Sequence, residues 1–292
     1  KLAGWIEKEV AFPCTMVDRI VPATTEEDKI TAEVELYARD EGLVVTEPYC
    51  QWVIEDVFPE GRPAWGQAGV TFSLEVKAFE KMKLRFLNGS HSTLAYLGYL
   101  AGKKTIAECI QWTPLRMLIQ HLMKKEILPT VDIPKNFNLK DYMDALILRF
   151  ANTGLNHRLD QIAMDGSQKL PPRLLDPIRD HLSESGSANI DVLSLAVAGW
   201  MRYVCGRDEA GSLITISDPM VGKLAERTHN FKRMPDEVVE NLLRLKKVFG
   251  IDLVENELFK KKVKGAFRDI CTLGTRTTIL KTLENVRYTE PT

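Results

Sequence analysis

The chain has 292 residues, 45% of them hydrophobic, and its 39 basic and 40 acidic side chains leave a net charge of −1. This size allows one large domain or two small ones, and the balanced charge argues against nucleic-acid binding or attraction to acidic membranes. No apolar run approaches the length that spans a bilayer, and the start shows no signal-peptide pattern. We therefore expect a cytoplasmic protein with no nucleic-acid or membrane partner.

The cysteines and histidines follow no disulfide or metal-binding pattern. The 5 cysteines are odd in number, widely scattered and free of C-x-x-C pairs, and the 5 histidines have no ligand spacing. Such usage is typical of reduced thiols in a cytoplasm. We expect neither a disulfide frame nor a metal cofactor.

The N-terminal segment begins inside a helical pattern. Residues 2–9 read as the end of a helix, and the chain opens without methionine, which indicates the remainder of a longer protein. Pro13 and Pro22 prevent residues 11–29 from forming one continuous helix.

Two polar features lie in this stretch. Asp18 directly precedes Arg19, so a local ion pair or a turn-capping role explains it without any function. Residues 24–29 have the composition of a helix start, with Thr24 or Thr25 as the N-cap.

Short strands are predicted next. Residues 42–58 are rich in β-branched and aromatic side chains and predict two short strands separated at Pro48. Residues 70–76, which follow a turn-rich segment, predict a third.

The longest uninterrupted helical pattern covers residues 77–102, KAFEKMKLRFLNGSHSTLAYLGYLAG. It lacks proline and carries apolar residues at three- and four-residue intervals. With about 100° per residue, its leucines occupy one half of the helical wheel, whereas Lys81 and Arg85 lie on the other half. The pattern predicts a helix whose solvated face is the Lys81/Arg85 side.

Four polar residues lie on or beside the leucine side of this helix: Glu80, Lys83, Asn88 and His91. A lysine that snorkels to water, or a core histidine with satisfied hydrogen bonds, explains any one of them singly. Four complementary groups on one face favour a functional site, because the costs of burying them add.

The chemistry that these groups suit is proton transfer at a carbinol or carbonyl. A free lysine, with a pKa of about 10.4, is a poor base at neutral pH, but apolar burial lowers a lysine pKa toward the useful range. Asn88 and His91 are spaced to hydrogen-bond the oxygen that gains or loses the proton. Lys83, Asn88 and His91 are therefore the candidate catalytic residues.

From residue 103 onward the periodicity is almost wholly helical, and prolines fall near the expected helix ends. The whole sequence predicts a mainly α fold, a multi-helical domain preceded by a few short strands. The predicted helices cover residues 105–111, 114–126, 138–150, 155–164, 171–183, 189–204, 218–228, 235–248, 256–272 and 274–285.

A second polar cluster surrounds the sequence D-G-S at residues 165–167. A turn between two helices, with Lys169 and Arg173 simply solvated, is one explanation. The other is that the turn presents Lys169 to a bound ligand, with Arg158 and Gln161 nearby in the sequence.

Several segments together resemble the polyol-specific long-chain dehydrogenases, the family of mannitol dehydrogenase and fructuronate reductase. The strongest is the pattern K-x4-N-x2-H that Lys83, Asn88 and His91 form within KMKLRFLNGSH. The resemblance extends through FPCTMVDRIVP, QWVIED, QIAMDGSQKLPPRLLDP and AVAGWMRY, and is greatest to the fructuronate reductase (D-mannonate oxidoreductase) branch.

The resemblance implies roles for the candidate residues. The family's motif lysine is the general acid/base, and its asparagine and histidine bind the reacting oxygen. By the resemblance, Asp18 becomes a substrate-side candidate and Lys169 a substrate-binding residue. Independently of the resemblance, the two polar clusters add Glu80, Arg158 and Gln161 as substrate-binding candidates. Gln161 stands where the hexitol-oxidising branch is expected to have an arginine, which counts against a simple mannitol dehydrogenase.

The resemblance also implies a cofactor domain outside this chain. The sequence has no G-x-G-x-x-G turn after a strand and no βαβ alternation long enough for a Rossmann unit. We expect NAD, rather than NADP, to be bound by an N-terminal Rossmann domain that precedes residue 1, and no metal. Residues 1–75 would then be a connecting segment and residues 76–292 the helical substrate and catalytic domain, inactive alone.

The predicted function is the catalytic C-terminal domain of an NAD-dependent oxidoreductase that interconverts D-mannonate and D-fructuronate. A hexitol dehydrogenase acting on mannitol or arabinitol is the alternative within the same chemistry. A non-catalytic helical interaction module is the alternative outside it. A buried Lys83 would favour the enzyme, and an exposed Lys83 would favour the module.

Overall fold

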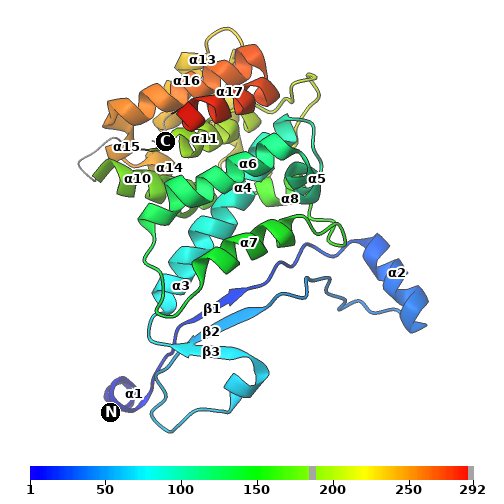
Figure 1. Ribbon diagram of the computed structural model, residues 1–292, viewed down its shortest axis with the longest axis vertical. Helices are drawn as coiled ribbons and strands as arrows, with labels where there is room; N and C mark the ends of the chain where they lie inside the picture. Colours follow the sequence, from blue (N-terminus) through cyan, green and yellow to red (C-terminus); the bar gives the residue numbers. More distant parts are fainter. Residues whose placement is uncertain (184–188, 289–292) are drawn as a thin grey trace. The chain divides into compact units, whose positions relative to one another are not determined.

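The computed structural model describes residues 1–183 and 189–288, which form two compact units (Figure 1). Unit 1 comprises residues 1–83 and 132–141, and unit 2 comprises the described residues of 84–131 and 142–292. The sequence predicts a boundary after residue 75, whereas unit 1 continues to residue 83. Helix α3 (Val76–Lys83) is part of unit 1 because it packs against the strands there.

A three-stranded sheet organises unit 1. Strands β1 (Thr15–Asp18), β2 (Gln51–Glu55) and β3 (Val70–Ser73) lie in the order β1-β2-β3, with β1 antiparallel and β3 parallel to β2. The strand predicted at residues 70–76 is confirmed. Residues 42–58 form one strand instead of two, since only the part after Pro48 finds partners. Strand β1 was not predicted, because its pairing with β2 is non-local.

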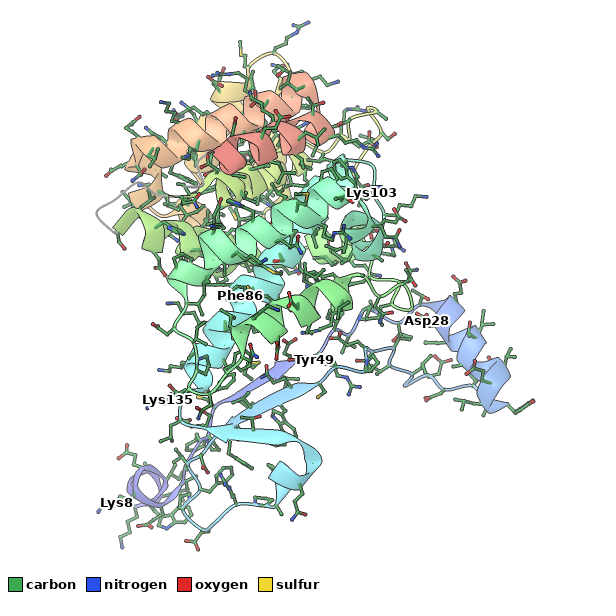
Figure 2. The ribbon with its side chains drawn as sticks, viewed as in Figure 1. Lys8, Asp28, Tyr49, Phe86, Lys103 and Lys135 are labelled. Carbon is green, nitrogen blue, oxygen red and sulfur yellow. The ribbon has the colours of Figure 1, made fainter. Side chains whose placement is uncertain are left out.

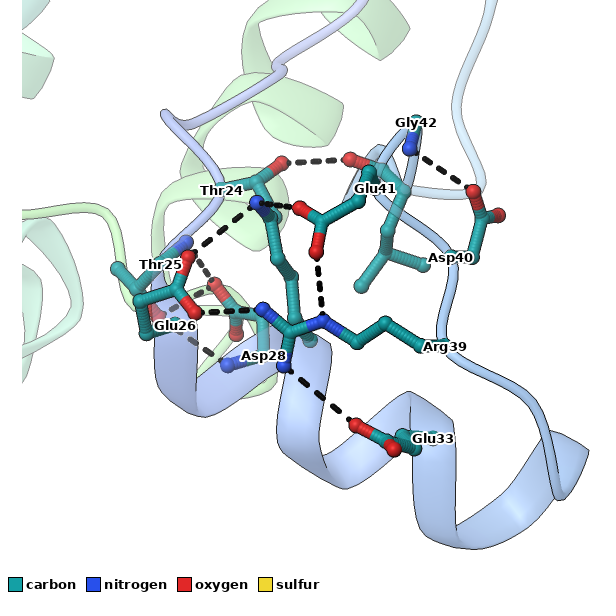
Figure 3. A network of polar contacts seen from close by, with 11 residues as sticks. Thr24, Thr25, Glu26, Asp28, Glu33, Arg39, Asp40, Glu41 and Gly42 are labelled. Atoms are coloured by element: carbon teal, nitrogen blue, oxygen red, sulfur yellow. Dashed lines mark hydrogen bonds and ion pairs between the residues drawn. The ribbon is translucent and has the colours of Figure 1, made fainter.

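The helices of unit 1 are short. Helix α2 begins at the capping box that its sequence predicts: the Thr25 hydroxyl accepts from the Asp28 N–H at 3.2 Å, and the Asp28 carboxylate accepts from the Thr25 N–H at 2.8 Å. Arg39 then bridges Glu26 at 2.7 Å and Glu41 at 2.8 Å (Figure 3). The helical segments are α1 (Leu2–Glu9), α2 (Glu26–Leu36), the 3₁₀ turn η1 (Trp65–Ala68) and α3.

Unit 2 is a helical assembly around α4 (Gly89–Leu100) and α11 (Asp191–Tyr203). Every residue of α4 except Tyr99 is buried, and α11 packs against both α4 and α16 (Figure 1). A Cβ built on Gly199 would lie 2.7 Å from Leu97 Cδ2, so α11 approaches α4 more closely than a side chain at this position allows. Phe86, labelled in Figure 2, is fully buried and meets the Tyr142 ring edge-on at 6.4 Å.

Most predicted helices of unit 2 are present. The patterns over residues 105–111, 138–150, 189–204, 256–272 and 274–285 each correspond to one helix. The helix predicted over residues 155–164 is shorter in the structure. The helix predicted over residues 235–248 is replaced by two consecutive helices. The remaining segments are π-helical η2 (Leu84–Asn88), η3 (Leu122–Ile127) and η5 (Pro171–Leu175), the 3₁₀ turn η4 (Leu128–Thr130), and helices α5 (Ile106–Gln111), α6 (Thr113–His121), α7 (Leu139–Phe150, which starts in unit 1), α8 (Leu159–Ala163), α9 (Gly166–Leu170), α10 (Asp176–Ser183), α12 (Val221–Arg227), α13 (Pro235–Leu243), α14 (Lys246–Phe249), α15 (Asp252–Glu255), α16 (Glu257–Leu273) and α17 (Thr275–Tyr288).

The solvated face predicted for residues 77–102 is wrong. The segment is helical throughout, as α3, η2 and α4 in succession, but Arg85 is only 6% exposed. Its guanidinium donates to the Thr130 carbonyl oxygen at 2.7 Å and pairs with Asp180 at 2.5 Å. The π segment holds one more residue per turn than an α-helix, so a wheel drawn with α-helical spacing misplaces the residues around it.

Candidate active site

Lys83 ends helix α3 and is half-buried in unit 1. Its Nζ donates a hydrogen bond of 2.5 Å to the carbonyl oxygen of Val17 in β1. The next residue of that strand is Asp18, which is fully buried. This hydrogen bond therefore holds the Lys83 side chain at β1, the strand whose last residue is Asp18. Its exposure lies between the buried lysine expected of an enzyme and the exposed lysine expected of an interaction module.

Glu80 does not lie on the packed face of α3, which corrects the sequence prediction. The buried residues of this helix are Val76, Phe79 and Met82, and Glu80 falls outside that stripe and is exposed. An exposed carboxylate one turn before Lys83 keeps contact with water and does not belong to a buried polar group.

Asn88 and His91 belong to unit 2. Asn88 is half-buried at the end of η2, and His91 is 6% exposed in α4. The His91 ring lies 4.8 Å from the Phe150 ring and 4.9 Å from the His157 ring, the latter edge-on at 88°. Burial lowers the pKa of His157 to about 4, so its imidazole is neutral at pH 7. His91 therefore packs between an aromatic ring and an uncharged imidazole.

The boundary between the two units falls directly after Lys83. Lys83 and Asp18 therefore belong to unit 1, and Asn88 and His91 belong to unit 2.

The D-G-S turn predicted between two helices is confirmed between α8 and α9. Asp165 has φ 55°, in the left-handed region, and the backbone N–H and hydroxyl of Ser167 donate to the Asp218 carboxylate at 2.7 and 2.6 Å. Gly166 has no room for a side chain, because a Cβ there would lie 2.7 Å from the Tyr96 hydroxyl. The turn is thus fixed from both sides.

Lys169 follows this turn, in α9, and is half-buried. Its Nζ donates to the Ile162 carbonyl oxygen at 3.3 Å. Burial lowers the pKa of Lys169, and the neighbouring Arg173 charge adds to this effect, against opposing contributions from Asp165 and Asp218. Burial and the Arg173 charge outweigh the two carboxylates, because the net effect is a lowered pKa.

Arg158 and Gln161 are engaged with an aspartate at the surface. Arg158 is exposed, and its Nε donates to Asp160 at 3.0 Å, which raises the pKa of Arg158. The Gln161 N–H donates to the same carboxylate at 3.0 Å. Arg158 also lines a pocket of about 610 Å³ with Tyr99, Lys103 and other residues. With its charge already paired, Arg158 is less suited than Lys169 to hold an anionic substrate.

Two contacts near the motif residues were not predicted. His157 lies beside the His91 ring, although the two residues are far apart in the sequence. Arg173 donates to the Ser92 hydroxyl at 3.2 Å, across a long stretch of sequence. Neither contact leaves a signal in local spacing, since each depends on how the helices of unit 2 pack.

Over residues 1–183 and 189–288, no three histidine, cysteine, aspartate or glutamate side chains gather as metal ligands. Within the same ranges, no helix is both long enough and apolar enough to cross a membrane.

Comparison with protein families matches two parts of the chain. Residues 75–271 match the mannitol dehydrogenase C-terminal domain, and residues 1–67 match the mannitol dehydrogenase Rossmann domain. The second match corrects the expectation that the Rossmann domain lies wholly before residue 1. The N-terminal segment is counted with that domain, although no glycine-rich turn is present in it.

Individual relatives agree with these matches. D-mannonate oxidoreductase of Escherichia coli is 47% identical over 276 residues, which cover 94% of this chain and 56% of that protein. Mannitol 2-dehydrogenase of Neosartorya fischeri is 37% identical over 286 residues, 97% of this chain and 55% of that protein. The chain thus spans little more than half the length of these relatives.

A solved structure also shares the fold. It is the ternary complex of Pseudomonas fluorescens mannitol 2-dehydrogenase with NAD and D-mannitol, with a TM-score of 0.86 and 31% identity. The similarity covers 97% of this chain and 56% of that one. Together with the match over residues 75–271, it shows that the chain belongs to the mannitol dehydrogenase family.

Proposed function

We propose that the protein is an NAD-dependent oxidoreductase that interconverts D-mannonate and D-fructuronate, with Lys83 as the general acid/base. The observation that carries the proposal is the identity of 47% to D-mannonate oxidoreductase, against 37% to mannitol 2-dehydrogenase. The motif residues Lys83, Asn88 and His91 all lie inside the segment that matches the family's C-terminal domain.

The residues of this chain contribute proton transfer and orientation. In the oxidative direction Lys83 takes the proton of the substrate hydroxyl, and in the reductive direction it returns a proton to the ketone oxygen. Asn88 and His91 hydrogen-bond that oxygen and stabilise the alkoxide charge that develops on it.

The hydride is exchanged with the nicotinamide of NAD. The described residues supply no glycine-rich phosphate-binding turn, so no part of the mechanism is assigned to contacts between this chain and the dinucleotide.

The neutral state of His157 supports the role of His91. Because burial keeps the pKa of His157 at about 4, the imidazole beside His91 carries no charge near neutral pH and does not repel a cation on the reacting groups.

The test compares kcat/KM of the full-length enzyme for fructuronate, tagaturonate and fructose with NADH. We expect fructuronate to be reduced with the highest kcat/KM. Equal or higher efficiency on fructose would overturn the substrate assignment, while leaving the role of Lys83 open to its own test.

A hexitol 2-dehydrogenase is the second candidate. It is favoured by the structural similarity to Pseudomonas fluorescens mannitol 2-dehydrogenase, whose solved complex contains D-mannitol. The same comparison of substrates distinguishes it, because this enzyme would oxidise mannitol and reduce fructose in preference to the sugar acids.

A further inference from the structure

Arg173 is a half-buried cation of unit 2 that has no acidic partner among the described residues. Its one hydrogen bond goes from Nη1 to the neutral Ser92 hydroxyl at 3.2 Å. Two other buried or half-buried arginines of unit 2 have carboxylates: Arg85 pairs with Asp180 at 2.5 Å, and Arg179 pairs with Asp252 at 2.6 Å. The buried Arg202 has two backbone carbonyl acceptors and the Phe231 ring instead, which is more than the single hydroxyl that Arg173 reaches. One neutral hydrogen bond does not offset the desolvation of a guanidinium, so Arg173 is held at a cost in stability.

Lys169 is a second cation in the same position. It too is half-buried, and its Nζ reaches only the Ile162 carbonyl oxygen, at 3.3 Å. The charge of Arg173 lowers the pKa of Lys169, so the two cations lie near each other. The carboxylates that act on Lys169 are Asp165 and Asp218, and Asp218 is already bonded to Ser167. Two adjacent, partly desolvated cations form a site for an anion.

Arg173 adjoins the start of α4, the helix that carries His91 and directly follows Asn88. The backbone of η5 approaches that helix closely, since a Cβ on Gly89 would lie 3.0 Å from the Arg173 carbonyl oxygen. Ser92, the hydrogen-bond partner of Arg173, directly follows His91. In the sequence it also lies four residues after Asn88.

We propose that Arg173, together with Lys169, binds the carboxylate of the sugar-acid substrate and thereby determines the preference for a hexuronate over a neutral hexulose. The assignment rests on the proposed function and deepens it. Arg173 provides the planar donor pair that matches a carboxylate, and Lys169 adds a second positive charge. A neutral hydroxymethyl group in the same place would leave Arg173 partly desolvated and without a carboxylate partner, and Lys169 with only Asp165 and Asp218 as counter-charges.

A purely structural role for Arg173 makes a different prediction. If the guanidinium only linked η5 to α4 through Ser92, its loss would impair acidic and neutral substrates alike. The ratio of their kcat/KM values therefore separates the two roles, and this ratio does not depend on the fraction of enzyme that folds.

The experiment measures kcat/KM of the full-length enzyme for fructuronate and for fructose, with Arg173→Met, Arg173→Lys and Ser92→Ala variants. We expect Arg173→Met to lower the fructuronate/fructose ratio by about 10- to 100-fold, the range for a lost hydrogen bond between charged groups. Arg173→Lys restores part of the preference, because it keeps the charge. Ser92→Ala keeps most of it, because the guanidinium remains. Arg179→Met, which removes a paired arginine of unit 2, is the matched control and leaves the ratio unchanged.

The outcomes separate this assignment from the proposed function. A wild-type enzyme that prefers fructose would overturn both. A wild-type enzyme that prefers fructuronate, with an Arg173→Met variant of unchanged ratio, would overturn only the role of Arg173. An equal loss on both substrates would likewise reduce Arg173 to a structural link.

Discussion

At the scale of single residues, Lys83 is the side chain on which the proposed chemistry depends. In the full-length enzyme, Lys83→Ala should lower kcat by about 10²–10⁴-fold, as is typical for loss of a general acid/base. Cofactor affinity should change little, because Lys83 is bonded to the Val17 carbonyl oxygen in unit 1 and not to a dinucleotide-binding turn. Steady-state kinetics with NADH and titration of NADH binding measure the two quantities.

Lys81→Ala is the matched control for this substitution. Lys81 lies on the same helix and pairs weakly with Asp132, at 3.9 Å, so its removal should leave kcat nearly unchanged. If Lys83→Ala retained more than about a tenth of wild-type activity, Lys83 would not be the general acid/base.

Some candidate residues can be grouped from their spacing in the sequence, whereas others are recognised only from contacts in the folded structure. Lys83, Asn88 and His91 are spaced along one helical pattern, so local periodicity is sufficient to group them. The hydrogen bond of Arg173 to Ser92, and its lack of an acidic partner within residues 1–183 and 189–288, depend on side chains brought together by packing, as does the contact of His157 with His91. Glu80 shows the limit of the local argument, since its helix turned a different stripe toward the core.

At the scale of elements, the start of α11 depends on a buried carboxylate from another segment. Glu126, in η3, is fully buried and accepts the N–H groups of Val192 and Leu193, both at 2.8 Å. No side chain at the N-cap of α11 makes such a bond. Burial raises the pKa of Glu126 to about 8, while the two N–H donors oppose that rise.

Glu126→Ala should therefore destabilise unit 2 by about 2–4 kcal/mol, because two buried N–H groups lose their acceptors. Urea-induced unfolding followed by circular dichroism measures this change. Glu126→Gln keeps an acceptor oxygen and should cost markedly less. Equal losses for the two variants would show that side-chain packing, and not the capping of α11, accounts for the effect.

Helices were predictable where a local period specified them, and other elements were not. The patterns over residues 189–204 and 256–272 correspond to α11 and α16 because each helix buries one regular stripe or its whole length. Strand β1 depends on pairing with β2, and the π segment η2 on the packing around Arg85, so neither is encoded locally. The cap from Glu126 is likewise supplied by a distant segment.

At the scale of the whole molecule, binding of the NAD cofactor can be tested on residues 1–292 alone. A polypeptide of residues 1–292 should not bind NADH with low-micromolar affinity. It has no G-x-G-x-x-G turn, and its parallel strands β2 and β3 are connected through the 3₁₀ turn η1 and not through an α-helix. Calorimetric titration of this polypeptide, beside the full-length protein as a positive control, measures the difference. Low-micromolar binding would show that the part matching the Rossmann domain, residues 1–67, is sufficient for the cofactor.

The close approaches along α4 have a consequence for hydrogen exchange. Gly89 lies against the backbone of η5, Gly98 against the Cys109 side chain of α5, and Gly199 of α11 against the Leu97 side chain, so each of three neighbours meets this helix at a glycine. A helix held in this way cannot fray or open by itself, because each opening would separate several packed elements at once. The amides of α4 should then exchange with deuterium only when unit 2 as a whole unfolds, and the segment that carries His91 would report the global stability of that unit.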